Sequence, residues 1–282
     1  MCIDELLQKS IKMLKENNIE EASSKAKILL AFYLDVQKEY LIIHNKETVD
    51  IKVEKAFLEA AQRLINNVPL QYITNKQEFM GMNFYVDENV LIPRADTEIL
   101  VEEVISICNK KDKVKILDLC TGSGVIAISV AKYIKKGEVT AIDISGNALE
   151  VATKNAKLNN TKINFKKLDL LKNIELEDKF DIIVSNPPYI ETNTIQQLSK
   201  DVQKEPIIAL DGGKDGLIFY KRIVDTAYKY LNKDGNLCFE IGYNQKDAVR
   251  NLIKENKHYE NIYSKKDLGG NDRIVICSKV EE

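Results

Sequence analysis

The chain contains few of the residues that build metal sites and disulfide frameworks. Its 282 residues include five cysteines, two histidines and no tryptophan. The cysteines are scattered without a CxxC pair, so no zinc site or disulfide framework is indicated, and we expect no metal. His44 and His258 lie among apolar or lysine-rich neighbours, which favours structural roles for both. This cysteine usage fits a reducing cytosol.

The sequence also lacks long apolar runs and an export signal. No apolar run approaches the ~18 residues of a membrane-spanning helix. The first turn carries Asp4 and Glu5 where a secretory signal would place basic and then apolar residues. We therefore expect a cytoplasmic protein with no membrane partner.

Neither sign of charge is in excess. Lysine and arginine total 41 against 43 aspartate and glutamate, for a net charge of −2. No global positive field would draw such a chain to nucleic acid, so direct binding to nucleic acid is not expected. The balance favours a protein or small-molecule substrate.

The chain is long enough for a domain of ~200 residues and a smaller one. Apolar residues recur at helical spacing from residue 3 to about 66, which predicts a small helical domain. Residues 78–87 read as a short hairpin joining the two parts. From residue 95 helices alternate with short apolar strands, so we expect a mostly parallel sheet covered on both faces.

The predicted division is a helical domain at 1–74, a hairpin linker at 75–94 and a larger domain at 95–282. Strands are expected at 114–119, 138–143, 163–168, 180–185, 236–241, 259–264 and 273–278, and helices at 95–108, 125–135, 146–158, 217–231 and 244–255.

A glycine-rich turn follows the first of these strands. Gly122 and Gly124 would let the backbone approach a ligand, and Asp143, at the end of the next strand, could accept both hydroxyls of a ribose. With Ala127 the same turn satisfies the dinucleotide pattern G-x-G-x-x-A, so the spacing alone leaves the cofactor open. Asp118 before the turn would repel a pyrophosphate but suit an ammonium or sulfonium cation. S-adenosylmethionine carries both cations and no phosphate.

The run Asn186-Pro-Pro-Tyr189 ends the strand predicted at 180–185. An asparagine amide accepts and donates hydrogen bonds, and Pro187, held extended by the next proline, aims its carbonyl stiffly. Tyr189 adds a flat face, so the run suits a planar NH2 group. The alternative is that the proline pair simply ends a strand. A matching cofactor turn elsewhere in the chain favours transfer to an amide or an exocyclic amine.

Over nearly its full length the chain resembles the release-factor glutamine methyltransferases, the PrmC or HemK family. The matching segments are Pro69–Ile73, Ile92–Glu98, Asp118–Gly124, Asn186–Ile190, Glu205–Leu217, Glu240–Gly242 with Gln245, and Asp267–Arg273. The resemblance implies an α/β fold: a seven-stranded, doubly wound, Rossmann-like class I S-adenosylmethionine-dependent methyltransferase sheet with a small all-helical N-terminal substrate-recognition domain. It implies methyl transfer from S-adenosylmethionine to the side-chain nitrogen (N5) of the glutamine in the Gly-Gly-Gln motif of class I peptide-chain release factors. We expect the chain to act as a monomer.

The resemblance also implies site residues. Cofactor contacts would fall on Cys120, Thr121, Gly122, Ser123, Gly124, Asp143, Leu170 and Asn186. Asn186, Pro187 and Tyr189 would be catalytic, and together with Pro188 they would hold the glutamine. Three positions depart from the family: Cys120 replaces a common glycine, Ala95 a common proline, and Leu170 an aromatic that often lies against the adenine.

Other readings stay open at this point. A DNA adenine methyltransferase uses the same slot for a flipped base, but would need a positive face and a target-reading domain. A sister enzyme modifies a glutamine of a large-subunit ribosomal protein, and Asp96-Thr-Glu98 favours the release-factor branch. A noncatalytic binding module would not explain why one chain carries both the glycine-rich cofactor turn and the Asn186–Tyr189 acceptor run. Arg94 and Glu98 are equally compatible with a functional contact and an interdomain ion pair, and Cys120 with a packing role and a reactive one.

Overall fold

The computed structural model describes residues 1–109, 113–134, 136–172 and 175–280. The chain divides into two compact units. The first comprises Met1–Lys76 together with Ser199–Lys204, and the second comprises Gln77–Leu198 and the chain from Glu205 onward. Within the described ranges, no helix is both long and apolar enough to cross a membrane.

The first unit is a small helical bundle with its own core. Its helices are α1 (Ile3–Glu16), α2 (Ala22–Leu34), α3 (Tyr40–Ile43), α4 (Ile51–Ile65) and α5 (Leu70–Thr74). Leu6, Leu29 and Phe57 are fully buried in that core, one from each long helix. The side chain of Asp50 accepts a hydrogen bond from the Lys52 amide at 2.7 Å and so caps α4. Apolar spacing over residues 3–66 predicted these three long helices correctly.

A two-residue turn forms the predicted hairpin. Strands β1 (Gln77–Phe79) and β2 (Met82–Phe84) pair antiparallel, and Met80 and Gly81 between them both have positive φ, at 50° and 67°. Two positive φ values in succession match the right-handed twist of a tight hairpin. Phe79 and Phe84 are buried among core residues of the second unit, so the hairpin packs as part of that unit.

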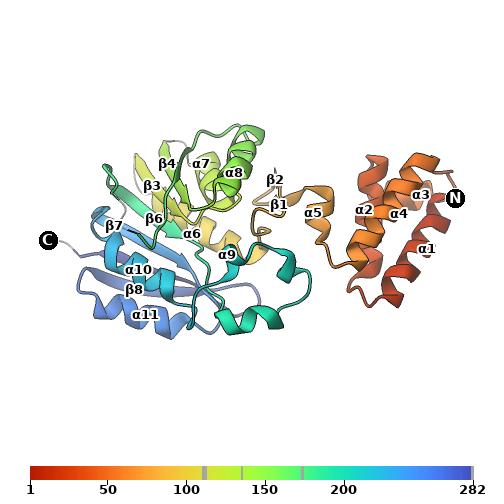
Figure 1. Ribbon diagram of the computed structural model, residues 1–282. Helices are drawn as coiled ribbons and strands as arrows, with labels where there is room; N and C mark the ends of the chain where they lie inside the picture. Colours follow the sequence, from red (N-terminus) through yellow and green to blue (C-terminus); the bar gives the residue numbers. More distant parts are fainter. Residues whose placement is uncertain (110–112, 135, 173–174, 281–282) are drawn as a thin grey trace. The chain divides into compact units, whose positions relative to one another are not determined.

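The second unit is built on a seven-stranded sheet (Figure 1). Its strands are β3 (Val114–Leu119), β4 (Gly137–Asp143), β5 (Asn164–Lys167), β6 (Phe180–Ser185), β7 (Leu231–Glu240), β8 (Tyr259–Lys266) and β9 (Asp272–Lys279). They lie in the order β5-β4-β3-β6-β7-β9-β8. The first five are parallel, and β9 runs antiparallel to both β7 and β8. This is the doubly wound α/β sheet that the sequence predicted.

Alternating side chains of the central strands divide between two apolar layers. Ile116 and Ile182 pack on one face of the sheet, while their neighbours Leu117 and Ile183 pack on the other. The helices of this unit are α6 (Glu98–Cys108), α7 (Val125–Tyr133), α8 (Gly146–Leu158), α9 (Ile207–Leu210), α10 (Ile218–Ala227) and α11 (Lys246–Glu255). Residues of α6, α7 and α8 belong to the first layer, and those of α10 and α11 to the second, so both faces are covered (Figure 1).

Most element boundaries agree with the predicted ones within a few residues. Strand β7 begins earlier than expected, at Leu231, because Asn232-Lys-Asp-Gly235 reads as a turn although it continues the strand, with Asp234 at φ 57°. Helix α10 is correspondingly shorter than predicted. Short 3-10 turns at Ala95–Thr97, Thr192–Gln197 and Val202–Lys204 were not expected. The predicted helix end at residue 135 and the final residues 281–282 lie outside the described residues.

Candidate active site

The candidate site lies where four strands end side by side. In the parallel register, Leu119 of β3 pairs with Ile142 of β4 and with Ser185 of β6. Ser185 in turn pairs with Phe239 of β7. The residues that follow these positions are therefore brought to one edge of the sheet. Chain connections leave β3 on one side toward β4 and return on the other side at β6, which is the switch point where ligands bind in such sheets.

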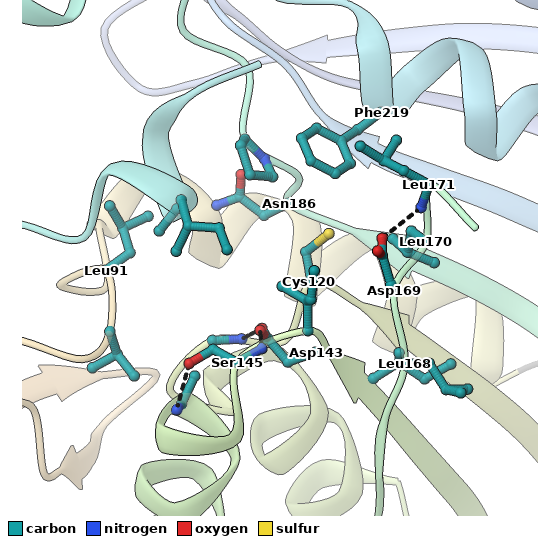
Figure 2. Close-up of a pocket in the computed structure, with 18 of the residues that line it drawn as sticks. Leu91, Cys120, Asp143, Ser145, Leu168, Asp169, Leu170, Leu171, Asn186 and Phe219 are labelled. Carbon is teal, nitrogen blue, oxygen red and sulfur yellow. Dashed lines mark hydrogen bonds between the residues drawn. The ribbon is translucent and has the colours of Figure 1, made fainter. Parts of the chain in front are cut away.

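A cavity of about 250 Å³ opens at this edge. Its walls are largely apolar, and they include Ile142, Leu168, Leu170 and Phe219. Figure 2 shows Leu168, Leu170 and Leu171 along one side of the cavity, with Leu91 on the opposite side. Polar groups are few, and Asp143 and Asn186 are prominent among them. An apolar cleft with a few placed polar groups is the usual form of a small-molecule site.

Asp143 already holds the backbone of two loops. Its Oδ2 accepts a hydrogen bond from the Gly122 amide at 2.8 Å and its Oδ1 accepts one from the Ser145 amide at 2.9 Å. Burial raises the pKa of Asp143, and the backbone amides of Ser145, Gly122 and Ile144 oppose that shift. An ionised carboxylate offers about four acceptor positions, so these amides leave it capacity for a further donor. Two adjacent hydroxyl groups of a ribose match that remaining capacity.

The glycine-rich turn is supported from below by Asp118. This carboxyl is fully buried, and its Oδ2 accepts hydrogen bonds from the Thr121 hydroxyl at 2.6 Å and the Ala127 amide at 3.3 Å. Burial raises the pKa of Asp118 to about 7. Gly124 has φ 83°, and a Cβ there would lie 3.0 Å from Cβ of Ala152 in α8. Gly124 therefore serves close helix packing, and Asp118 orders the turn instead of lining the cavity.

The loop Asn186-Pro-Pro-Tyr189 follows β6. Asn186 and Pro188 line the cavity, and the Asn186 Nδ2 donates to the Thr97 hydroxyl at 3.4 Å. The Tyr189 hydroxyl donates to Oε1 of Glu240 at 3.4 Å. Burial raises the pKa of Tyr189 well above its ordinary value, so the phenol stays protonated. Its aromatic ring packs against the apolar layer that contains α10 and α11.

A second segment packs directly behind this loop. Gln245 Nε2 donates to the carbonyl oxygens of Tyr189 at 2.9 Å and Gly216 at 3.3 Å. Gly216 has φ 68°, and a Cβ there would collide with the Tyr189 carbonyl oxygen. A Cβ on Gly212 would likewise approach Cα of Tyr189 to 2.7 Å. Gly212 and Gly216 are thus required by close backbone packing behind the acceptor loop.

The Asp96-Thr97-Glu98 segment contacts three separate parts of the unit. Asp96 pairs with Arg273 at 3.0 Å, and the Glu98 carboxylate accepts from the Met80 amide at 2.6 Å. The middle residue, Thr97, is the partner of Asn186. Glu98 therefore anchors the hairpin and has no contact with the cavity among the residues that the structure describes.

Arg94 forms an ion pair with the buried Glu205, whose other oxygen accepts from the Ile92 amide at 2.9 Å. Both partners belong to the second unit, so the pair is not interdomain. It ties the segment before Asp96 to the segment that leads into α9.

The structure brings part of the predicted site together. Cys120, Gly122, Asp143, Leu170, Asn186 and Pro188 line the cavity. The described lining does not include Thr121, Ser123, Gly124, Pro187 or Tyr189, which lie within two residues of lining residues in the chain. The buried Ser123 presents its carbonyl oxygen to Asn155 of α8 at 2.9 Å.

Several lining residues were not expected. Ile142 and Ile144 flank the predicted Asp143, Leu171 follows the predicted Leu170, and Leu168 directly follows β5. Neighbours of the predicted residues and the ends of strands would therefore have indicated them. Phe219 supplies an aromatic wall from α10. Nothing in the sequence near Leu170 points to it, although it provides the kind of ring that Leu170 lacks. Residues 89–91 and 208–209 also line the cavity.

Cys120 adopts a conformation that favours glycine, with φ 61°. A side chain at such a φ costs on the order of 1 kcal/mol. Burial raises the pKa of the Cys120 thiol, and the neighbouring Asp143 and Asp118 raise it further. The thiol therefore stays protonated, which supports a packing role and not a nucleophilic one.

Comparisons with known proteins agree with this architecture. Residues 5–74 match the PrmC N-terminal domain and residues 95–209 match the methyltransferase small domain. The chain is 41% identical over 281 residues to a release factor glutamine methyltransferase of Clostridium acetobutylicum, covering 98% of both chains. The chain belongs to the release factor glutamine methyltransferase family. A relative of the same name from Flavobacterium psychrophilum is 45% identical over 214 residues, covering 73% of this chain and 74% of that protein.

Solved structures share the fold of the larger unit. A methyltransferase from Pyrococcus furiosus superposes with a TM-score of 0.53 at 18% identity, covering 78% of this chain and 98% of that one. At this identity the likeness speaks for the class I methyltransferase fold alone. The seven-stranded sheet and the helical N-terminal domain expected of the family are therefore both present.

Asp118 generates a prediction about stability and pH. Its pKa is about 7 in the folded protein against an ordinary value of 3.8, so between these values the unfolded chain is ionised while the fold keeps the proton. Stability from this group is full at low pH and falls as pH rises through that window. Asp118→Asn removes the dependence, and the variant should gain about 3 kcal/mol relative to the parent between pH 5 and pH 8.

Urea unfolding of both proteins at pH 5 and pH 8 measures this difference. Asp178→Asn is the control, because the pKa of exposed Asp178 is lowered by its hydrogen bond to Lys115 and any change should have the opposite sign. A constant difference between Asp118→Asn and the parent across the two pH values would contradict the assignment.

Proposed function

We propose that this chain transfers a methyl group from S-adenosylmethionine to N5 of the glutamine in the Gly-Gly-Gln motif of class I release factors. The observation that carries the proposal is that Asn186 and Pro188 of the acceptor loop line the same cavity as Asp143 and the glycine-rich turn. A planar amide held at the loop would lie at the wall of the cofactor cavity. Membership of the release factor glutamine methyltransferase family supports the choice of acceptor.

The cavity fits S-adenosylmethionine in its chemistry. Asp143 keeps acceptor capacity for the ribose hydroxyls, and Leu170, Phe219 and Ile144 offer apolar surface to the adenine. Gly122 has no described atom within 4 Å of the place where a Cβ would stand, which leaves room beside the turn. When bound, the cofactor supplies an electrophilic methyl group on a sulfonium.

The protein's task is to orient a weak nucleophile. An amide nitrogen shares its lone pair with the carbonyl, so it reacts only when it is aimed well and enriched in electron density. We propose that the Asn186 Oδ1 and the Pro187 carbonyl accept the two N–H hydrogens of the glutamine. Tyr189 would pack beside the amide plane. The proton is lost after methyl transfer, so no strong base is needed beforehand.

The remaining assignments belong to the same proposal. The backbone of Cys120–Gly124 with Leu170 would complete the cofactor site, and Pro188 would stiffen the acceptor loop. We propose residues 1–74 as the domain that recognises the release factor, 75–94 as the connection and 95–282 as the catalytic domain. We also propose a cytoplasmic monomer that acts in translation termination without binding nucleic acid or membranes directly. The independent core of the helical unit and the near-neutral charge support this view.

Labelled S-adenosylmethionine tests the acceptor. We expect label in a class I release factor and none in the same factor with its motif glutamine changed to alanine. A large-subunit ribosomal protein and duplex DNA serve as the competing acceptors. Label in either of those, with none in the release factor, would overturn the proposed substrate.

Asn186→Ala tests the acceptor loop. The variant should lose roughly 100-fold or more in kcat, in line with removal of a single preorganised hydrogen-bonding group from an active site, while release-factor binding changes little. Steady-state methylation and a direct binding measurement separate the two effects. Asn164→Ala, on β5 away from the cavity, should behave as the parent. Unchanged turnover of Asn186→Ala would refute the role.

Asp143→Ala tests the cofactor site. Loss of a charged acceptor for two hydroxyls should weaken S-adenosylmethionine binding by roughly 100-fold or more, because hydrogen bonds to charged groups each contribute about 1.5–3 kcal/mol. Isothermal titration calorimetry with the cofactor measures it directly. Asp178→Ala, whose carboxylate pairs with Lys115 on the surface, is the matched control. Parent-like affinity in Asp143→Ala would remove Asp143 from the ribose assignment.

A further inference from the structure

The orientation of the Asn186 amide is set from outside the acceptor loop. Its Nδ2 donates to the Thr97 hydroxyl at 3.4 Å, near the long end of hydrogen-bond distances. Thr97 is 2% exposed and ends the 3-10 turn Ala95–Thr97. A bond of this length contributes little to stability, but it places the NH2 group of the amide toward Thr97.

Glu240 lies behind Thr97. The register that pairs Ser185 with Phe239 brings Glu240, the next residue of β7, to the same edge as Asn186. Glu240 is 2% exposed, and the hydroxyls of Thr97 and Tyr189 both interact with its carboxylate. Burial raises the pKa of Glu240 to about 7, while the Thr97 hydroxyl and the charge of Arg273 act in the opposite direction.

Arg273 is itself fixed in place. Its guanidinium pairs with Asp267 at 2.9 Å and with Asp96 at 3.0 Å. Asp96 directly precedes Thr97, so the same ion pair fixes the turn that carries the hydroxyl. The arginine therefore favours the ionised form of Glu240 and the position of Thr97 together.

The single hydrogen of the Thr97 hydroxyl relates the hydrogen bond with Asn186 to the contact with Glu240. A threonine hydroxyl has one hydrogen, and an ionised carboxylate can only accept. In the structure the Thr97 oxygen accepts from the Asn186 NH2, which leaves the one hydrogen of its hydroxyl for the carboxylate of Glu240. The Asn186 Oδ1 then points away from Thr97. In the reversed amide, an oxygen would face an oxygen with no hydrogen between them.

We propose that Thr97, backed by Glu240, is a positioning residue that holds the Asn186 amide with its oxygen available to the substrate glutamine. The inference rests on the proposed function for its consequence in catalysis. A reversed Asn186 would present N–H donors to the N–H donors of the acceptor amide, and the nitrogen would not be held in line for transfer. Thr97 touches neither substrate nor cofactor in this scheme.

Thr97→Val, Thr97→Ser and Thr153→Val test the proposal kinetically. Valine has the shape of threonine without the hydroxyl, and we expect kcat to fall roughly 10- to 100-fold while the cofactor affinity stays as in the parent. Thr97→Ser keeps the hydroxyl and should recover most of kcat. Thr153, whose hydroxyl bonds within α8 to the Leu149 carbonyl at 2.7 Å, provides a threonine-to-valine control without effect.

A double-mutant cycle asks whether Thr97 acts through Asn186. In the Asn186→Ala background, Thr97→Val should cause little further loss, because the group that it orients is gone. Full additivity of the two losses, or a Thr97→Ser variant as impaired as Thr97→Val, would overturn the proposal.

A readout without turnover separates this proposal from the proposed function. In 15N-labelled protein, the side-chain NH2 signal of Asn186, identified by its absence in Asn186→Ala, should shift in Thr97→Val and remain near its parent position in Thr97→Ser. An NH2 signal that does not respond to Thr97→Val would overturn the positioning role, whether or not the enzyme methylates a release factor. A parent protein that shows the NH2 response but leaves the release factor unmethylated would overturn the proposed function alone.

Discussion

The site depends on one constraint, which is that four parallel strands end in register. Leu119, Ile142, Ser185 and Phe239 lie abreast through backbone hydrogen bonds, so the residues that follow them, Cys120, Asp143, Asn186 and Glu240, reach the same edge of the sheet. The glycine-rich turn, Asp143 and the acceptor loop would otherwise be three unrelated segments of the chain. Since a one-residue slip of a strand would turn each side chain to the opposite face, the buried layers on both faces hold the register.

Rigidity of the acceptor loop is the second requirement. Transfer to an amide nitrogen depends more on the orientation of that nitrogen relative to the methyl group than on a strong base. Such an orientation requires a rigid backbone in the acceptor loop. Gln245 and Gly216 hold the Tyr189 carbonyl from behind, and Thr97 orients Asn186 from the side. Residues far apart in the chain thus support four consecutive residues, and none of these supporting residues lines the described cavity.

The sequence predicted what depends on local pattern. Period-two and period-3.6 apolar spacing located the strands and helices, and strand ends with special residues located Asp143 and Asn186. Contacts between segments far apart in the chain could not be predicted from this local pattern. Phe219 lines the cavity only because α10 packs over the strand ends, and Thr97 reaches Asn186 across 89 residues of chain. The acidic Asp118 was read as facing a cation, whereas its side chain is fully buried beneath the turn, a distinction that depends on side-chain direction at one strand tip.

Two buried carboxyl groups lower the stability of the fold but orient groups next to the candidate site. Asp118 is the penultimate residue of β3 and Glu240 the last residue of β7, and burial raises the pKa of each to about 7. Each also keeps one oxygen without a hydrogen-bond partner among the described residues. Apolar side chains would pack at both positions without that cost. What the carboxylates provide is direction: Asp118 holds Thr121 and the Ala127 amide, and Glu240 interacts with the hydroxyls of Thr97 and Tyr189. Groups that break the rule for a stable core are expected next to an active site, and both lie directly behind its two loops.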